Sequence, residues 1–187
     1  MADTNTTNAL ETFAGEFKAT RHEVLQTSVS RETAEADRDR VEASATRLKD
    51  LEEVAIHNMA GTKVEPSRVA DFLRIKGIQA LNDQHRSEIT DMEMGKFALT
   101  EGDLHLNLRQ RDNRNEKRTA LNGAADLIAR GEPLDNTRDN TRQLELVRME
   151  LGVALGRLES EARAQNDPEH SAELKAFVDS LPSPDSK

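Results

Sequence analysis

The chain has 187 residues, of which 35 are acidic and 26 basic, giving a formal net charge of −9 at pH 7. Cysteine, tryptophan and tyrosine are absent, and the chain contains only nine glycines and five prolines. This composition excludes disulfide scaffolds, zinc–thiolate sites, collagen-like repeats and most β-rich folds. Because Glu, Arg, Gln and Ala supply much of the sequence, we expect an all-α protein whose helices depend on packing between helices or between chains.

No run of apolar residues is long enough to span a membrane. Residues 1–7 form a polar tail without the basic start and apolar segment of a secretory signal peptide. We therefore expect a cytoplasmic protein with no membrane partner. A place in a virion or secretion by a non-classical route are the alternatives.

The first predicted element is helical and extends from residue 8 to about residue 60. Apolar residues recur there at heptad spacing, which is typical of a coiled coil. Arg31 and Arg38 fall on the apolar seam, either as a solvated stretch or as a polar layer that fixes the register. The sequence leaves open whether residues 8–60 form one unbroken helix. The candidate interface residues of this element are Leu10, Phe13, Phe17 and Leu48.

The segment from Gly61 to Pro66 predicts a turn between two helices. Gly61 suits the end of one helix and Pro66 the first turn of the next. Since short connections join antiparallel helices, residues 8–94 predict an elongated antiparallel hairpin with its tip near 61–66. The hairpin closes either within one chain or between chains. In the best register, Leu48 lies opposite Ile78, a further candidate interface residue. Arg38 then lies beside Glu88.

The remaining residues, 95–187, predict shorter helices. These helices cover about 103–130 and 137–163 within the segment 95–163, and then 167–181, before a polar tail over 182–187. We expect the helix over 137–163 to dock on the Leu10–Phe17 end and form a small bundle. On that helix Gly152 and Gly156 share one face and indicate tight packing against another helix. Its apolar stripe of candidate interface residues consists of Leu144, Val147, Leu151, Leu155 and Leu158.

No group of residues predicts catalytic chemistry. Gly61-Thr62-Lys63 lacks the upstream glycine and the strand of a phosphate-binding loop. The five histidines are spread along the chain, and Glu53 and His57, one helical turn apart, are interpreted as surface residues. We predict no catalytic, cofactor or metal site, no small-molecule substrate and no enzymatic activity.

The most basic stretch covers residues 109–118. Arg111, Arg114 and Arg118 share one helical face there and are candidates for contacts with phosphate or with an acidic partner. Single-strand binding usually adds aromatic stacking, and no aromatic residue lies within ten residues of this stretch. The pattern therefore favours an acidic helix or subunit over nucleic acid.

A long helix, a tip with Pro66-Ser67 and an antiparallel return that ends in a basic stretch loosely resemble the stalk and chaperone-escort proteins of flagellar and type III export. The chain differs from them in being acidic and in continuing well beyond Gly131. Virion scaffolding proteins are similarly acidic, cysteine-free and helical. Neither resemblance assigns a role to a residue.

Together, these features predict a non-enzymatic α-helical structural or assembly protein, for example a component of a virion or of another macromolecular complex. It would act through protein–protein contacts and form a homo-oligomer. One alternative is a stalk, chaperone-escort or exported component of a type III or flagellar-type secretion system. The other is a nucleic-acid-binding accessory protein that uses residues 109–118.

Overall fold

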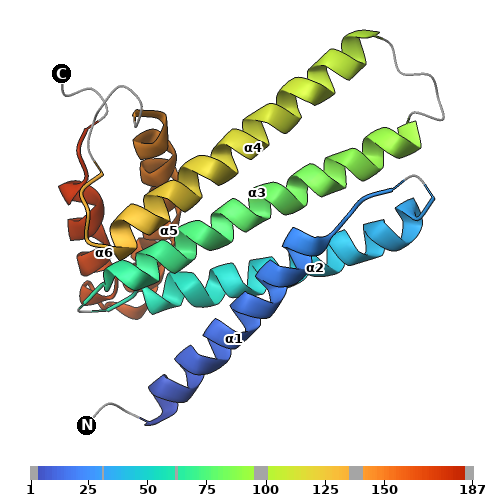
Figure 1. Cartoon of the computed structure of the whole chain (residues 1–187). Helices are drawn as coiled ribbons and strands as arrows, with labels where there is room; N and C mark the ends of the chain where they lie inside the picture. Colours follow the sequence, from blue (N-terminus) through green and yellow to red (C-terminus); the bar gives the residue numbers. More distant parts are fainter. Residues whose placement is uncertain (1–3, 31, 62, 95–100, 135–140, 184–187) are drawn as a thin grey trace. The chain divides into compact units, whose positions relative to one another are not determined.

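The computed structural model describes the backbone of residues 4–30, 32–61, 63–94, 101–134 and 141–183, and all of their side chains except those of 4–6, 94 and 101–111. This part of the chain contains six α-helices and no strand, which confirms the all-α class (Figure 1). The helices are α1 (Thr4–Gln26), α2 (Ala34–Asn58), α3 (Pro66–Met94), α4 (Glu101–Ala129), α5 (Thr141–Gln165) and α6 (Glu169–Ser180).

The helices form two compact units. Unit 1 consists of Met1–Leu51 and Ile78–Glu116, and unit 2 of Glu52–Gly77 and Lys117–Lys187. Three helices, α2, α3 and α4, contribute residues to both units. Each unit is therefore built from helical segments that are far apart in the sequence.

Residues 8–60, for which the sequence leaves an unbroken helix open, form two helices, because the chain leaves the helix between Gln26 and Ala34. Asp37, buried in the first turns of α2, accepts hydrogen bonds from the Ser30 backbone N–H and the Thr33 hydroxyl, both at 3.0 Å. Hydroxyl and carboxylate side chains that bond nearby backbone groups compete with helical hydrogen bonds and favour helix starts. The break therefore needs neither glycine nor proline. Helix α1 also starts at Thr4, inside the expected tail.

In unit 1, α2 and α3 contact each other in antiparallel order. The Asn82 side chain donates to the Val41 carbonyl at 3.0 Å, and the Gln79 side chain donates to the Leu48 carbonyl at 3.4 Å. Arg38 forms its ion pair with Glu93 rather than with the expected Glu88. The Glu88 carboxylate instead accepts a hydrogen bond from Gln84 on its own helix at 3.0 Å. Arg31 lies outside the described residues.

The turns after α2 and α4 use glycine in the left-handed region of the backbone. Gly61 has φ of 99° and Gly131 has φ of 69°, where a side chain would be strained. Helix α3 begins at Pro66, as the sequence predicts. The connection that contains residues 135–140 lies outside the described residues.

The apolar stripe of α5 lies in the core of unit 2. Leu144, Val147, Leu151 and Leu158 are buried, whereas Leu155 is half-buried. Helices α5 and α6 pack against each other, and Leu174 and Val178 of α6 are also buried. The leucine stripe of this helix is therefore covered by the chain's own helices.

The aromatic pair Phe13 and Phe17 is buried in unit 1. The two rings stack on α1 with centroids 6.1 Å apart. Helix α5 belongs to unit 2, so its docking on the Leu10–Phe17 end stays a prediction. Leu10 itself is half-buried.

Candidate functional site

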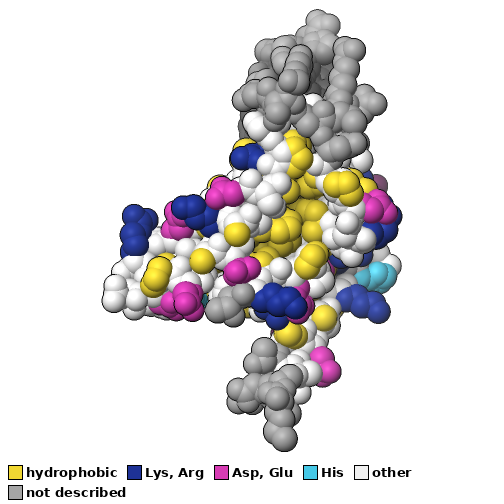
Figure 2. Space-filling view, turned by 90° about the vertical axis from the view of Figure 1, so that its left-hand side faces the viewer, with side chains coloured by type: hydrophobic (Ala, Val, Ile, Leu, Met, Phe, Trp, Pro, Cys, Tyr) yellow, Lys and Arg dark blue, Asp and Glu magenta, His cyan; other side chains and the backbone are white. Residues whose placement is uncertain are grey.

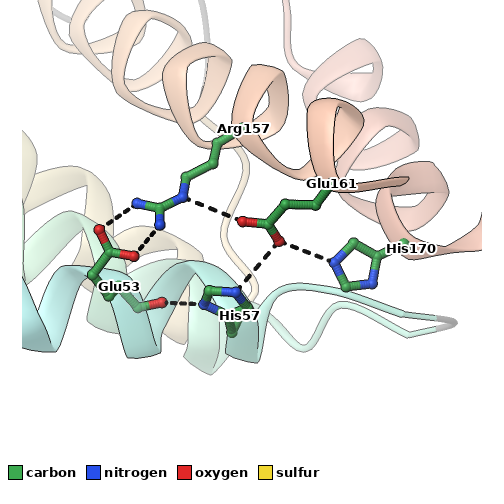
Figure 3. A network of polar contacts seen from close by, with 5 residues as sticks. All are labelled: Glu53, His57, Arg157, Glu161 and His170. Carbon is green, nitrogen blue, oxygen red and sulfur yellow. Dashed lines mark hydrogen bonds and ion pairs between the residues drawn. The ribbon is translucent and has the colours of Figure 1, made fainter. Parts of the chain in front are cut away.

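A network of charged side chains joins three helices of unit 2 (Figure 3). Arg157 on α5 contacts both carboxylate oxygens of Glu53 on α2 and lies 3.4 Å from Glu161, one turn along its own helix. Glu161 in turn contacts His57 of α2 and His170 of α6 through one oxygen, Oε2, with both distances at 3.3 Å. One carboxylate therefore links the ends of α2, α5 and α6.

His57 faces an oxygen atom with each of its two ring nitrogens. Its Nδ1 lies 2.8 Å from the Glu53 carbonyl oxygen, which can only accept a hydrogen bond, so Nδ1 donates. Its Nε2 faces the Glu161 carboxylate, which is also an acceptor when ionised. Both contacts are hydrogen bonds only when the ring carries a proton on each nitrogen.

The pKa of Glu161 is lowered from its ordinary value. Burial by itself raises this pKa, but the hydrogen bond from His170 and the positive charges of His57 and Arg157 together outweigh it. The turn after α2 supports the same junction, because the Gly61 backbone N–H donates to the His170 carbonyl at 3.1 Å. The network therefore holds an ionised carboxylate at the contact between three helices.

A second group of charges in unit 2 surrounds Glu150, a buried residue of α5. Its carboxylate lies 3.4 Å from Nζ of Lys76 on α3 and 2.5 Å from Nζ of Lys117 on α4. Lys76 also contacts Glu52 of α2 at 2.9 Å. A buried carboxylate needs such partners because an isolated buried charge is strongly unfavourable. Lys117 belongs to the basic stretch 109–118, so one of the basic residues of that stretch is already paired within the chain.

The other basic candidates have different environments. Arg114, in unit 1, is half-buried. Burial raises the pKa of Asp91, and the positive charge of Arg114 opposes only part of this rise. Arg118, in unit 2, is half-buried, and its carbonyl lies close to Gly77. The side chain of Arg111 lies outside the described part of the chain. The described basic side chains of this stretch are thus half-buried rather than fully exposed.

The last turns of α5 and the first turns of α6 line an open hollow of about 560 Å³. Its lining includes Arg163 and Lys175 together with Glu159, Asn166 and the buried Ser171. Cationic, hydroxyl and amide groups suit an anionic group, but Glu159 adds a negative charge on the same lining. This mixed charge does not select one class of ligand.

Comparisons with protein-family models, with curated proteins and with solved structures find no match for the chain. In the part of the chain that the structure describes, no helix is long and apolar enough to cross a membrane. Within the same residues, no three His, Asp or Glu side chains are placed to hold a metal ion.

Large hydrophobic side chains remain at the surface of the described helices. Met149 and Val153 are 50% and 64% exposed on the face of α5 opposite its leucine stripe. The face drawn in Figure 2 likewise presents hydrophobic side chains among charged ones. The other exposed large hydrophobic residues are Leu25 and Val54.

The residues that link the helices of unit 2 are not predicted by the sequence pattern. Glu161 and His170 carry no local signature beyond the helical spacing of Arg157 and Glu161. Glu150 is the one charged residue buried along α5, and in the sequence it lies between Val147 and Leu151 of the predicted apolar stripe. A glutamate flanked by leucine and valine positions is the signal that could have indicated a buried ion pair.

Proposed function

We propose that the chain is a non-enzymatic structural or assembly protein that acts through protein–protein contacts and self-association. The observation that carries this proposal is the pair of exposed hydrophobic residues on α5, Met149 and Val153, in a chain with few apolar residues. Exposed apolar groups on a helix that already buries its opposite face favour contact with another protein. Such a protein could be a component of a virion or of another macromolecular complex.

The charge networks support a structural role. Glu150 and Glu161 are contacted by basic side chains of other helices, so their charge serves to join helices. A catalytic carboxylate, by contrast, is expected to lie next to a cavity with a second convergent functional group. The hollow beside α6 does not include either carboxylate in its lining.

We further propose that α2 and α3 form an elongated hairpin of the coiled-coil type. The antiparallel contacts of Val41 with Asn82 and of Leu48 with Gln79 support it, as does the heptad spacing of α2. Packed helix axes lie about 8–10 Å apart. An experimental structure with Leu48 and Ile78 Cα atoms more than about 12 Å apart contradicts the hairpin.

Light scattering coupled to size exclusion tests the proposed function directly. We expect a mass that rises above the 20.8 kDa of one chain as the concentration increases. Refractive index must measure the concentration, because the chain has no Trp or Tyr. A mass of one chain at every concentration, together with no protein bound in pull-downs, contradicts the proposal.

The nucleic-acid alternative has weaker support. Lys117 is paired with Glu150, and Arg114 is half-buried near Asp91, so neither is a fully exposed contact for phosphate. Retention on DNA or RNA that falls with salt, and that is lost in the triple variant Arg111→Glu, Arg114→Glu and Arg118→Glu, would favour this alternative.

A further inference from the structure

The hollow beside α6 is lined by two helix segments that run antiparallel. Near the turn, Glu161 of α5 contacts His170 of α6, and farther along, the Arg148 side chain donates to the Leu181 carbonyl at 2.8 Å. In this order the lining residues form pairs that are equally far from Asp167 in the turn. The pairs are Asn166 with Pro168, Arg163 with Ser171, Ala162 with Ala172, and Glu159 with Lys175. The hollow therefore has one polar end near the turn and another farther from it, with two alanines between them.

The end near the turn contains hydrogen-bonding groups without partners. Ser171 is only 8% exposed, and within the described residues its hydroxyl forms no hydrogen bond. Arg163 donates from Nε to the Glu159 carbonyl at 3.2 Å, but its guanidinium forms no ion pair with a described carboxylate. The Asn166 amide, on a residue with φ of 55° where glycine is more usual, likewise has no partner in the described chain. Since buried hydroxyls normally have a hydrogen-bond partner, this end is suited to a bound molecule.

Other cations of unit 2 have the carboxylate partners that Arg163 lacks. Lys76 contacts Glu52 of α2, and Arg157 contacts Glu53 of the same helix. A phosphate or a carboxylate has several acceptor oxygens, so it can accept from a guanidinium, a hydroxyl and an amide at once. The end near the turn is therefore complementary to one of these anionic groups.

The end farther from the turn combines opposite charges. Glu159 on α5 and Lys175 on α6 form no ion pair within the described chain. A hydroxyl group can donate to a carboxylate and accept from an ammonium, so a single hydroxyl satisfies both side chains. An amino group would be repelled by Lys175, and a second anionic group by Glu159. The sum of the charges thus selects no ligand, but their positions do.

We propose that the hollow binds a small hydroxylated anion, in which a phosphate or carboxylate group lies about 6 Å from a hydroxyl group, the helix rise between Arg163 and Glu159. Arg163, Ser171 and Asn166 bind the anionic group, and the hydroxyl lies between Glu159 and Lys175. A hollow of about 560 Å³ has the size of small-molecule sites in proteins. The inference goes beyond the proposed function and does not depend on self-association.

Nuclear magnetic resonance titration of the full-length chain tests the site and separates the two anionic groups. The added compounds are glycerol 3-phosphate, glycerate and propyl phosphate, which lacks the hydroxyls, at matched ionic strength. We expect saturable amide shifts at residues 159–175 with glycerol 3-phosphate or glycerate, and the tighter of the two identifies the anionic group. Propyl phosphate should bind more weakly than glycerol 3-phosphate by about threefold, because it leaves Glu159 without a donor.

Variants of the lining separate specific binding from attraction to any cation. Arg163→Gln should weaken binding of glycerol 3-phosphate or glycerate about tenfold, and Ser171→Ala about threefold. Arg142→Gln, which removes an exposed cation elsewhere on α5, is the matched control and should leave the affinity unchanged. Glu159→Gln should reduce the preference for glycerol 3-phosphate over propyl phosphate, since it removes both the acceptor and the negative charge.

Thermal unfolding of Ser171→Ala gives a second measurement that does not depend on the spectra. Without ligand, this variant should be at least as stable as the wild-type chain, because it removes a hydroxyl without a partner and alanine favours helix. With saturating ligand, the wild-type chain should gain more stability than the variant, because a ligand that binds only the folded state stabilises it in proportion to its affinity.

Three outcomes would overturn the inference. The first is the absence of saturable shifts at residues 159–175 with every compound. The second is equal weakening in Arg163→Gln and Arg142→Gln, which would show non-specific attraction of anions. The third is equal affinity for glycerol 3-phosphate and propyl phosphate together with no effect of Glu159→Gln, which would remove the hydroxyl from the proposed ligand.

Discussion

Asp37 in unit 1 and Glu150 in unit 2 are both buried carboxylates, but different kinds of contact stabilise them. Asp37 accepts hydrogen bonds from Ser30 and Thr33, which lie just before it in the sequence. Glu150 instead lies between lysines from two other helices, α3 and α4. One carboxylate therefore stabilises the start of a helix, whereas the other joins three helices.

The comparison extends to the other buried polar groups of the two units. Among the described side chains, the buried polar atoms without a hydrogen-bond partner include the Ser44 hydroxyl and a nitrogen of Arg114, both in unit 1. In unit 2, Glu150 and Glu161 each have basic partners on other helices. A buried charge is tolerated only with such partners. The ion pairs of Glu150 and Glu161 therefore favour packing between the particular helices of unit 2 that carry these partners.

Removing Glu150 should have the largest effect on stability. The variant Glu150→Ala leaves the ammonium groups of Lys76 and Lys117 without their buried partner, and we expect a loss of about 3 kcal/mol in the free energy of unfolding. Urea unfolding followed by circular dichroism measures this loss. Glu173→Ala, exposed on α6, is the control and should change stability by less than about 0.5 kcal/mol. A loss below about 1 kcal/mol for Glu150→Ala contradicts the ion-pair account.

Removing Asp37 should have a smaller effect, because its contacts are local. Asp37→Ala removes the acceptor of the Ser30 N–H and Thr33 hydroxyl bonds, and we expect a loss of about 1–2 kcal/mol. Asp37→Asn, whose amide oxygen can accept the same bonds, should recover part of this loss. Asp39→Ala, exposed two residues along, serves as the control. Equal losses for the alanine and asparagine variants would show that the hydrogen bonds are not responsible.

The two carboxylates also show how far the sequence predicts this structure. Turn glycines, the proline at the start of α3 and apolar spacing predicted the all-α class and the main helices, because these signals act locally. The break before α2 is local too, but it depends on hydroxyl and carboxylate side chains, which are common in helical sequences. The contacts of Glu150, Glu161 and His170 depend on which helices meet in space. Residue spacing along one chain contains no information on that point.

Acid should reduce the stability of both units. The hydrogen bond from the Ser30 N–H, which outweighs burial, lowers the pKa of Asp37, and basic neighbours lower the pKa of Glu161. The stability from these groups is present above their unfolded pKa values of about 4 and is lost as pH falls through the lowered values. Burial raises the pKa of Asp71 and Asp91, which opposes the loss.

Urea unfolding at pH values from 6 to 3 measures this dependence. We expect the Asp37→Asn and Glu161→Gln variants each to lose less stability on acidification than the wild-type chain, because neither retains the group that must be protonated. Asp39→Asn, at an exposed position, should follow the wild-type curve. An Asp37→Asn curve parallel to that of the wild-type chain would mean that Asp37 does not titrate with unfolding.

The smallest effect is expected at Glu53, next to Glu52 on α2. Glu53 and Arg157 form an ion pair with both side chains more than a third exposed, whereas Glu52 and Lys76 form one with both largely buried. Water screens the exposed pair, so the coupling energy in a double-mutant cycle of Glu53→Gln and Arg157→Gln should stay below about 1 kcal/mol. The same cycle with Glu52→Gln and Lys76→Gln should give a larger coupling energy. A larger coupling energy for Glu53 and Arg157 than for Glu52 and Lys76 would mean that burial does not determine the strength of the ion pairs between the helices of unit 2.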